Sequence, residues 1–293
     1  MEPQTLSSSI VQNFTPTRKS TSRKGDNGIV LVVGGSYIYH GAPVLSSLAA
    51  LRCGTDLVYT CVPKINVTPT RAISPNLIVI PLVDQKLTLG AVKKLVGALP
   101  RNLHSATIGM GLAIQEKNSL LHLVKSLLDR DVRLSLDASA LIPEILPILA
   151  HKNVVVTPHA GEFKRLFGDV PSDSNLERIK LVEENALKHG ITILLKGSTD
   201  IISDGKITYL CEKNTPAMTV GGTGDVLSGL VAGLLSTNRN PLESAAAASY
   251  ICGLAGKEVQ EKLGLHITSM DLIDSIPSVM KPFDKIIWLE WTH

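Results

Sequence analysis

The stretch IVLVVGGSYIYHGAPVLSSLAALR, residues 29–52, places an apolar run, a glycine-containing loop and a helical pattern directly after one another. Residues 29–33 are apolar without alternation, which is typical of a strand covered on both faces. Gly34-Gly35-Ser36 ends this run, and the Ala-rich residues 42–51 favour a helix. The stretch therefore predicts one strand–loop–helix unit of an α/β protein.

The same unit recurs along the chain. Further strand candidates are residues 57–62, 77–82, 106–108, 132–136, 154–156 and 191–195, and helical patterns lie between several of them, at 91–99, 119–130 and 176–189. Nearer the C-terminus, residues 200–203 and 207–210 flank Asp204-Gly205, a hairpin signal, and helical patterns follow at 223–236 and 241–263. This alternation predicts a mostly parallel central sheet with helices on both faces.

The composition is that of an ordinary globular protein, with 44% hydrophobic, 19% charged and 4% aromatic residues. The formal net charge is +3, and the basic residues of segment 1–25 account for it. The rest of the chain is balanced, so we expect no nucleic-acid partner. No linker splits the chain, and we expect an N-terminal arm over residues 1–25 and a single domain over residues 26–293.

Cysteine spacing and hydropathy bear on the compartment. Cys53, Cys61, Cys211 and Cys252 show neither CxxC pairing nor zinc-ligand spacing, so we expect buried free thiols in a reducing cytoplasm. The long uncharged run at residues 27–51 is interrupted by Gly34-Gly35, His40 and Pro43, where a membrane-spanning helix needs continuous apolar residues. We therefore expect a cytoplasmic protein with no membrane partner.

The strongest functional signal is GGTGD at residues 221–225, directly before an amphipathic helix. Free amides and the dipole of a helix N-terminus favour an anion, and glycines let a phosphate approach the backbone. Asp225 falls in the first helical turn, where we expect the dipole to keep its carboxylate ionised. A carboxylate beside an anion site suits a general base in phosphoryl transfer. The simpler alternative is a glycine-rich turn whose aspartate only stabilises the helix start.

Other strand ends carry weaker signals. KGSTD at residues 196–200 follows a strand, and Lys196 with its neighbours would offer a cation, amides and a hydroxyl to a nucleotide. In TPHAGE at residues 157–162, His159 and Glu162 fit a substrate contact and a water-mediated magnesium ligand, or equally a helix cap. The loops at Gly34 and Gly109 are not GxGxxG, and small residues at these strand ends predict one long cleft along the sheet edge.

Taken in order, GGSYIYHGAP, GMGLA, DASAL, TPHAGEFKRL, KGSTD and TVGGTGDVLSG, spread over residues 34–229, resemble the NAD(P)H-hydrate dehydratases of the ribokinase-like superfamily. GGTGD alone would indicate only the superfamily, which includes many small-molecule kinases. The resemblance implies a ribokinase-like three-layer α/β sandwich. It also implies repair of the S form of hydrated NADH or NADPH, in which a nucleotide transiently phosphorylates the hydrate hydroxyl and phosphate then leaves.

The resemblance also implies roles for individual residues. Asp225 would be the base and the amides around Gly222 and Gly224 would hold the developing charge, while Ala42, Gly111, His159 and Asp225 would contact the substrate. The nucleotide contacts would be Lys196, Gly197, Ser198, Thr199, Asp200, Thr223 and Gly224. Mg²⁺ is implied, with Glu162 as a ligand through water. The co-substrate is ADP or ATP, and the resemblance to stand-alone members favours ADP.

Two alternatives stay open from the sequence. A ribokinase-like kinase of a hydroxyethylthiazole or hydroxymethylpyrimidine type of alcohol would use the same anion site and base but stop at the phosphate ester. A non-catalytic nucleotide sensor is the other, which an intact Asp225 disfavours. Residues 214–218, NTPAM, also depart from the GNPGM that is frequent in the family. Relatives are oligomers, and we expect a homotetramer.

Overall fold

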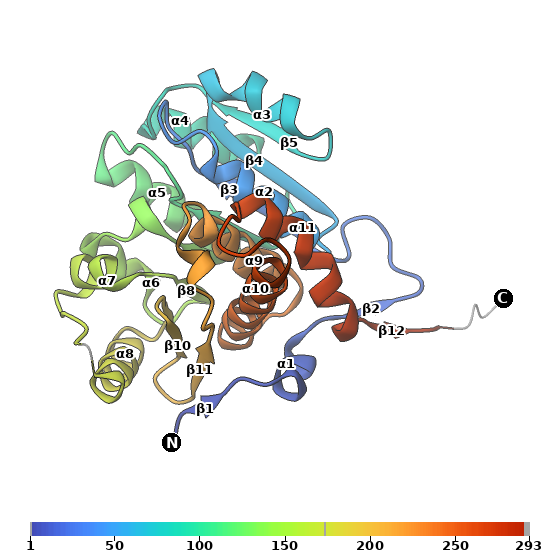
Figure 1. Cartoon of the computed structure of the whole chain (residues 1–293). Helices are drawn as coiled ribbons and strands as arrows, with labels where there is room; N and C mark the ends of the chain where they lie inside the picture. Colours follow the sequence, from blue (N-terminus) through green and yellow to red (C-terminus); the bar gives the residue numbers. More distant parts are fainter. Residues whose placement is uncertain (1, 173, 290–293) are drawn as a thin grey trace.

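The computed structural model describes residues 2–172 and 174–289, and its centre is a ten-stranded sheet (Figure 1). Its larger part is parallel and consists, in spatial order, of β5 (Ile78–Leu82), β4 (Leu57–Pro63), β3 (Ile29–Val33), β6 (Ser105–Ile108), β7 (Arg133–Leu136), β8 (Val154–Val156) and β9 (Thr192–Leu195). The antiparallel β10 (Thr199–Ser203) and β11 (Thr208–Glu212) continue it, and β1 (Gln4–Thr5) pairs parallel with β11. The predicted mostly parallel sheet is confirmed.

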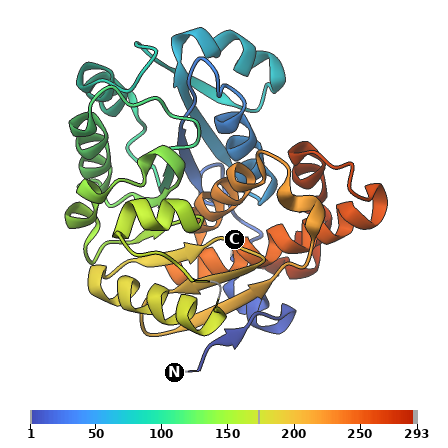
Figure 2. The same ribbon diagram turned by 60° about the vertical axis from the view of Figure 1, so that its left-hand side comes forward.

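Both faces of the sheet are buried. In β3, Ile29, Leu31 and Val33 join one apolar core, whereas Val30 and Val32 point into the opposite one. The first face carries α4 (Leu89–Ala98), α5 (Lys117–Leu128), α7 (Ala160–Phe167) and α8 (Asn175–His189), with the short α6 (Leu146–Leu149). The second carries α2 (Ala42–Arg52), α9 (Thr223–Thr237), α10 (Pro241–Leu263) and α11 (Ser269–Met280) (Figure 2). The expected three-layer α/β sandwich is confirmed.

The N-terminal segment packs onto this body. Helix α1 (Ser8–Phe14) lies against α10, where the hydroxyls of Ser8 and Tyr250 are 2.9 Å apart. Strand β2 (Thr17–Lys19) pairs parallel with β12 (Lys285–Ile287), and α3 (Val67–Ile73) lies beside β5 at the far edge of the sheet. All four cysteines are free and buried, as predicted. Within the described residues, no helix is both long and apolar enough to cross a membrane.

The strand order changes direction between β3 and β6. From β3 the chain builds outward to β4 and β5, then returns to β6 on the other side. Open α/β sheets bind ligands at such a point. The two glycine loops meet there, because the Gly35 N–H donates to the Met110 carbonyl at 2.9 Å. A Cβ on Gly34 would lie 2.5 Å from the same oxygen, so only glycine fits.

Helix α9 packs very closely on α2. A Cβ on Gly229 would lie 2.1 Å from the carbonyl oxygen of Ser46, and one on Gly233 would lie 2.1 Å from the sulfur of Cys53. Two glycines one turn apart on α9 therefore let the backbones approach, and this fixes the helix that begins at the GGTGD loop.

Candidate active site

The GGTGD loop forms a tight turn whose amides open the helix α9. Gly222 is the N-cap residue at φ 96°, and a Cβ there would lie 2.6 Å from Leu45 and from the hydroxyl of Ser269. That hydroxyl donates to the carbonyl of Gly221 at 2.7 Å and holds the turn from α11. No side chain caps the helix. Because uncapped first-turn amides and the helix dipole attract negative charge, the turn is suited to a phosphate group.

Asp225 lies in the first turn of α9, as predicted, but its carboxylate is not held ionised as the sequence suggested. Burial raises the pKa of Asp225 most, and the carboxylates of Asp137 and Glu162 raise it further. The Lys196 cation lowers it, and the net pKa is about 7. Desolvation and neighbouring negative charge thus outweigh the helix dipole. A carboxylate with a pKa near 7 accepts a proton far more readily than an ordinary aspartate does.

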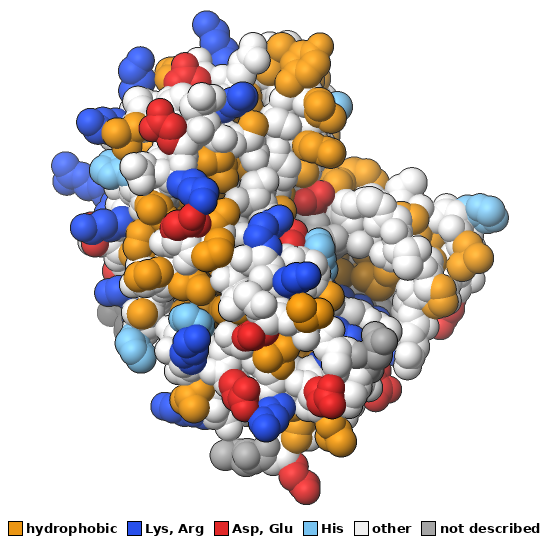
Figure 3. Space-filling view, turned by 90° about the vertical axis from the view of Figure 1, so that its left-hand side faces the viewer, with side chains coloured by type: hydrophobic (Ala, Val, Ile, Leu, Met, Phe, Trp, Pro, Cys, Tyr) orange, Lys and Arg blue, Asp and Glu red, His pale blue; other side chains and the backbone are white. Residues whose placement is uncertain are grey.

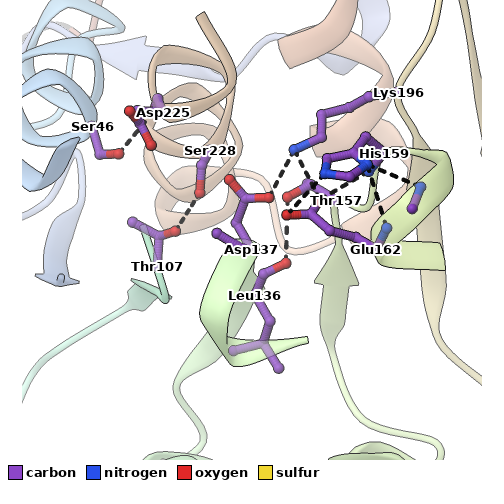
Figure 4. Close-up of polar contacts among 12 residues, drawn as sticks. Ser46, Thr107, Leu136, Asp137, Thr157, His159, Glu162, Lys196, Asp225 and Ser228 are labelled. Carbon is purple, nitrogen blue, oxygen red and sulfur yellow. Dashed lines mark hydrogen bonds and ion pairs between the residues drawn. The ribbon is translucent and has the colours of Figure 1, made fainter. Parts of the chain in front are cut away.

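Lys196 directly follows β9, and its side chain reaches the carboxylates of Asp137 and Glu162 (Figure 4). Its Nζ lies 2.9 Å from Oδ1 of Asp137 and 3.6 Å from Oε2 of Glu162. Burial lowers the pKa of Lys196, but the two carboxylates outweigh it and the net pKa is raised, so the side chain stays a cation. A Cβ on Gly224 would lie 3.6 Å from this Nζ, which places the cation at the N-terminus of α9. Asp137, Glu162, Lys196 and Asp225 are called the acid–lysine cluster below.

His159 and Glu162 form the start of α7. Nδ1 of His159 accepts the N–H groups of Gly161 at 3.0 Å and Glu162 at 3.4 Å, while Oε2 of Glu162 accepts the N–H of His159 at 2.9 Å. This reciprocal capping box is the simpler of the two interpretations left open by the sequence. It does not use up either side chain, because Glu162 also faces Lys196, and Nε2 of His159 remains a donor 3.6 Å from Oε1 of Glu162.

Asp200 holds the loop between β9 and β10 from the inside. Its carboxylate is fully buried and accepts the N–H of Gly197 at 3.0 Å, the hydroxyl of Ser249 at 2.7 Å and the Nζ of Lys213 at 2.6 Å. Burial lowers the pKa of Lys213, but Asp200 reverses this effect and the net pKa is raised. The sequence suggested that Asp200 contacts the nucleotide. Asp200 belongs to the lining of the cavity described next, and its carboxylate is bonded to these internal partners and positions the loop backbone, so the nucleotide contact stays a prediction.

A cavity of about 720 Å³ lies beside the α9 N-terminus and the β9–β10 loop. The predicted residues that line it are His159, Lys196, Gly197, Ser198, Asp200, Thr223 and Gly224. Residues that the sequence analysis did not assign also line it: Lys213, Asn214, Thr215, Pro216, Met218, Thr219 and Leu227. The available signal for these was the NTPAM departure before the glycine loop. A space-filling view shows a hollow in this side of the molecule, bordered by acidic, basic and histidine side chains (Figure 3).

Ala42 and Gly111 lie together, but outside the lining of that cavity. Gly111 adopts φ 61°, and a Cβ on it would lie 3.3 Å from Cβ of Ala42 and 2.7 Å from Cβ of Tyr39. One helical turn after Ala42, Ser46 donates to the backbone carbonyl of Asp225 at 2.7 Å. Asp225 therefore stands between two groups of predicted site residues, the cavity on one side and the β3–β6 loops on the other.

The acid–lysine cluster can accept a magnesium ion that arrives with phosphates. The described residues contain no group of three or more His, Cys, Asp or Glu side chains that would hold a metal by themselves. Mg²⁺ commonly uses one or two protein carboxylates and takes its other ligands from water and substrate phosphates. Glu162 and Asp137 supply carboxylates of this kind, although Lys196 already lies against both. A ligand role through water, as predicted for Glu162, fits this arrangement.

Comparison with known proteins places the chain in a family. Residues 30–278 match the model of the NAD(P)H-hydrate dehydratase family. The chain is 79% identical, over 98% of its length and 100% of the relative's, to the ADP-dependent (S)-NAD(P)H-hydrate dehydratase of Nitrosopumilus maritimus. It is 65% identical to the enzyme of the same name from Cenarchaeum symbiosum, over 94% of this chain and 96% of that one.

A solved structure has the same architecture as this chain. The ADP/ATP-dependent NAD(P)H-hydrate dehydratase of Bacillus subtilis, co-crystallised with ATP and Mg²⁺, superposes with a TM-score of 0.84 at 26% identity, covering 97% of this chain and 100% of that chain. The predicted ribokinase-like resemblance, the arrangement of the site and these matches agree with one another. The chain is a member of the NAD(P)H-hydrate dehydratase family.

Proposed function

We propose that this protein uses ADP to dehydrate the S form of hydrated NADH or NADPH and so restores the reduced cofactor. The observation that carries the proposal is Asp225, a carboxylate with a pKa of about 7 at the uncapped N-terminus of α9 and close to the partly buried Lys196. A base, an anion site and a cation at one point are the parts that phosphoryl transfer to a hydroxyl requires. The family and the names of the archaeal relatives support the same substrate and nucleotide.

The cavity at the α9 N-terminus is the proposed nucleotide site. Its volume of about 720 Å³ suits a nucleoside diphosphate. The amides of Thr223 and Gly224 and the cation of Lys196 bind the phosphates, and the loop of Gly197, Ser198 and Thr199 borders the rest of the nucleotide. Asp200 holds that loop in place through the N–H of Gly197.

The hydrated nicotinamide is proposed to lie on the other side of Asp225. Ala42 and Gly111 border this position near the β3–β6 switch point, where the Tyr39 loop also packs against Gly111. His159 lines the nucleotide cavity, so its proposed substrate contact is made from that side through Nε2, because its Nδ1 already accepts two backbone N–H groups. With this placement the substrate hydroxyl meets Asp225 and the terminal phosphate together.

The reaction then proceeds in two stages. Asp225 removes the hydroxyl proton while the hydroxyl oxygen bonds to the terminal phosphorus of the nucleotide, and the bridging P–O bond breaks to leave AMP. Helix amides at Gly222–Gly224 and the Lys196 cation hold the negative charge that develops. The ring nitrogen lone pair next expels phosphate with the C–O electron pair, and loss of the adjacent C–H proton restores the double bond.

Magnesium would supply charge neutralisation between the nucleotide phosphates. The chain's own contribution is to keep Glu162 and Asp137 in place, which the capping box of α7 and the contact with Lys196 accomplish. Asp137 and Glu162 raise the pKa of Asp225, and Lys196 lowers it. The lysine therefore helps to keep part of the Asp225 population ionised and able to accept a proton.

The assay is recovery of reduced-nicotinamide absorbance from hydrated NADH with Mg²⁺ and either ADP or ATP. We expect recovery with ADP and its loss in Asp225→Asn, which keeps the shape of the side chain and retains ADP affinity, with the exposed Asp129→Asn as the matched control. No recovery with either nucleotide refutes the dehydratase. Accumulation of a phosphate ester of a thiazole or pyrimidine alcohol would support the alternative kinase, and nucleotide binding without turnover would support a sensor.

The homotetramer stays a prediction. Helix α10 offers no support for it through its alanines, because Ala245–Ala248 are fully buried within the chain itself. Light scattering on the purified protein tests it directly, since a tetramer has about four times the 31.3 kDa of one chain.

A further inference from the structure

A second cavity, of about 510 Å³, lies at the opposite edge of the sheet from the acid–lysine cluster. Its walls are the amino ends of parallel strands, the C-terminal end of α9 and the β2–β12 segment. His104 precedes β6, Arg133 begins β7 and Arg239 follows α9, and all three also line an adjoining cavity of about 320 Å³. Helix α9 has 15 residues, about 22 Å, and the catalytic Asp225 is in its other end.

His104 is fixed as a hydrogen-bond donor toward this space. Its Nδ1 accepts the N–H of Ile29 at 3.0 Å, so the neutral ring carries its proton on Nε2. Burial lowers the pKa of His104, Arg133 and Arg239 lower it further, and Asp26 opposes them with a smaller effect. The histidine therefore stays neutral near pH 7 and retains one N–H for a ligand.

Arg133 is held near a second arginine without a nearby counter-charge. Its Nη2 donates to the carbonyl of Ser236 at 3.2 Å, which stabilises the end of α9, but its Nε is buried without a partner. Across residues 2–172 and 174–289, neither Arg133 nor Arg239 has a carboxylate within 4 Å. Burial lowers the pKa of Arg133, and repulsion from Arg239 lowers it further against a weaker opposing effect of Asp131.

The other charged groups of the cavity do not neutralise this pair. Arg18 and Lys285 use their cationic ends on the carbonyls of Gly54 and Gln12. The acids in the lining are Asp26, which accepts the N–H of Arg23, and Asp284. The hydrogen bond from Arg133 to the Ser236 carbonyl at the end of α9 uses one of the five donors of the guanidinium. It explains neither the unpaired positive charge nor the cavity beside it.

We propose that this cavity is a second anion site, which binds the phosphate group of a small phosphorylated molecule between Arg133, Arg239 and His104. A guanidinium fork matches phosphate oxygens bidentately, and the neutral imidazole adds a third donor. Bound phosphate relieves the repulsion between the two arginines, which is the physical reason to expect affinity there. This site is separate from the nucleotide cavity, because it lies at the amino ends of the strands and shares no lining residue with that cavity.

The test is calorimetric titration of inorganic phosphate and of pyrophosphate into the full chain, without divalent metal and with saturating ADP to fill the nucleotide cavity. We expect one additional site. Arg239→Gln, a change at an exposed side chain that leaves the fold intact, should weaken it about tenfold or more, and Arg239→Lys should weaken it less. Lys94→Gln on the exposed face of α4 is the matched loss of one positive charge and should leave binding unchanged.

Arg133→Gln is the second variant, and its melting temperature is measured alongside because the side chain also stabilises α9. Weaker pyrophosphate binding in both arginine variants, with ADP affinity unchanged, supports the site. Absence of binding at millimolar phosphate and pyrophosphate overturns it. Equal affinity in wild type and Arg239→Gln overturns it as well, and so does an equal loss in Lys94→Gln, because binding would then follow net charge alone.

Discussion

The raised pKa of Asp225 makes a quantitative prediction about stability, because a carboxylate that is reluctant to ionise weakens the fold whenever it does so. In the native chain its pKa is about 7, against an ordinary aspartate value of 3.8. Between these values the folded protein binds a proton that the unfolded chain has released. Stability from this group is therefore intact below about pH 4 and falls as pH rises, until the loss is complete above pH 7.

The size of this loss follows from the shift. A rise of about 3 units, at about 1.4 kcal/mol per unit, corresponds to about 4 kcal/mol. Asp225→Asn removes the ionisation but keeps the shape, so the variant should be more stable than wild type by a few kcal/mol at pH 8. Near pH 4 both side chains are neutral, and the difference in stability should vanish.

The assay is urea unfolding of wild type and Asp225→Asn at several values between pH 4 and pH 8.5, with the free energy difference plotted against pH. Exposed Asp129→Asn serves as the control and should give a flat line. A pH-independent difference, or an asparagine variant that is less stable at pH 8, would refute the reasoning. Confirmation would show that the site retains an unfavourable charge because proton transfer requires it, a known cost of function.

Further predictions concern the helix contact, the buried ion pair and the pH–rate profile. Gly229→Ala should destabilise the protein by at least about 2 kcal/mol in urea unfolding, because its Cβ would meet a backbone carbonyl of α2 at 2.1 Å. Gly221→Ala is the control and should leave stability unchanged, because no atom lies within 4 Å of the added Cβ. Lys213→Met leaves a fully buried carboxylate without its cation and should cost about 3–5 kcal/mol in the same assay, and wild-type stability would contradict this. The value of kcat/KM should fall as pH drops below about 7, where Asp225 becomes protonated. Lys196→Gln should move this acidic limb of the pH–rate profile to higher pH, because the lysine lowers the pKa of Asp225. An unmoved limb would show that Lys196 does not influence the pKa of the base.

Much of the fold could be read from local sequence. Continuous apolar runs such as residues 29–33 and 154–156 predict strands buried on both faces, and these strands begin and end where expected. The hairpin at Asp204-Gly205 and the helix after GGTGD were likewise recognised from turn and capping chemistry. These features depend on neighbours in the chain, so their signal lies within a few residues.

The family motifs also predicted Asp225, Lys196 and the helix amides as candidate site residues, because each follows a strand end or opens a helix. Their chemistry was less accessible. The sequence suggested that the dipole keeps Asp225 ionised. In the structure burial raises its pKa, and the carboxylates of Asp137, which follows β7, and of Glu162, in the first turn of α7, raise it further. Only the folded chain brings these acids together.

The tertiary structure alone decided which groups face a ligand and which face the core. The sequence grouped Asp200 with the nucleotide contacts, and only the fold shows that its buried carboxylate pairs with Lys213, which directly follows β11. The proximity of Arg133 and Arg239 at the C-terminal end of α9 could not be predicted from the residues that surround either arginine in the sequence. Strand positions, helix ends and glycine turns are encoded in local sequence, whereas strand order, charge environment and cavities depend on which segments the fold brings together, and on the water that their packing excludes.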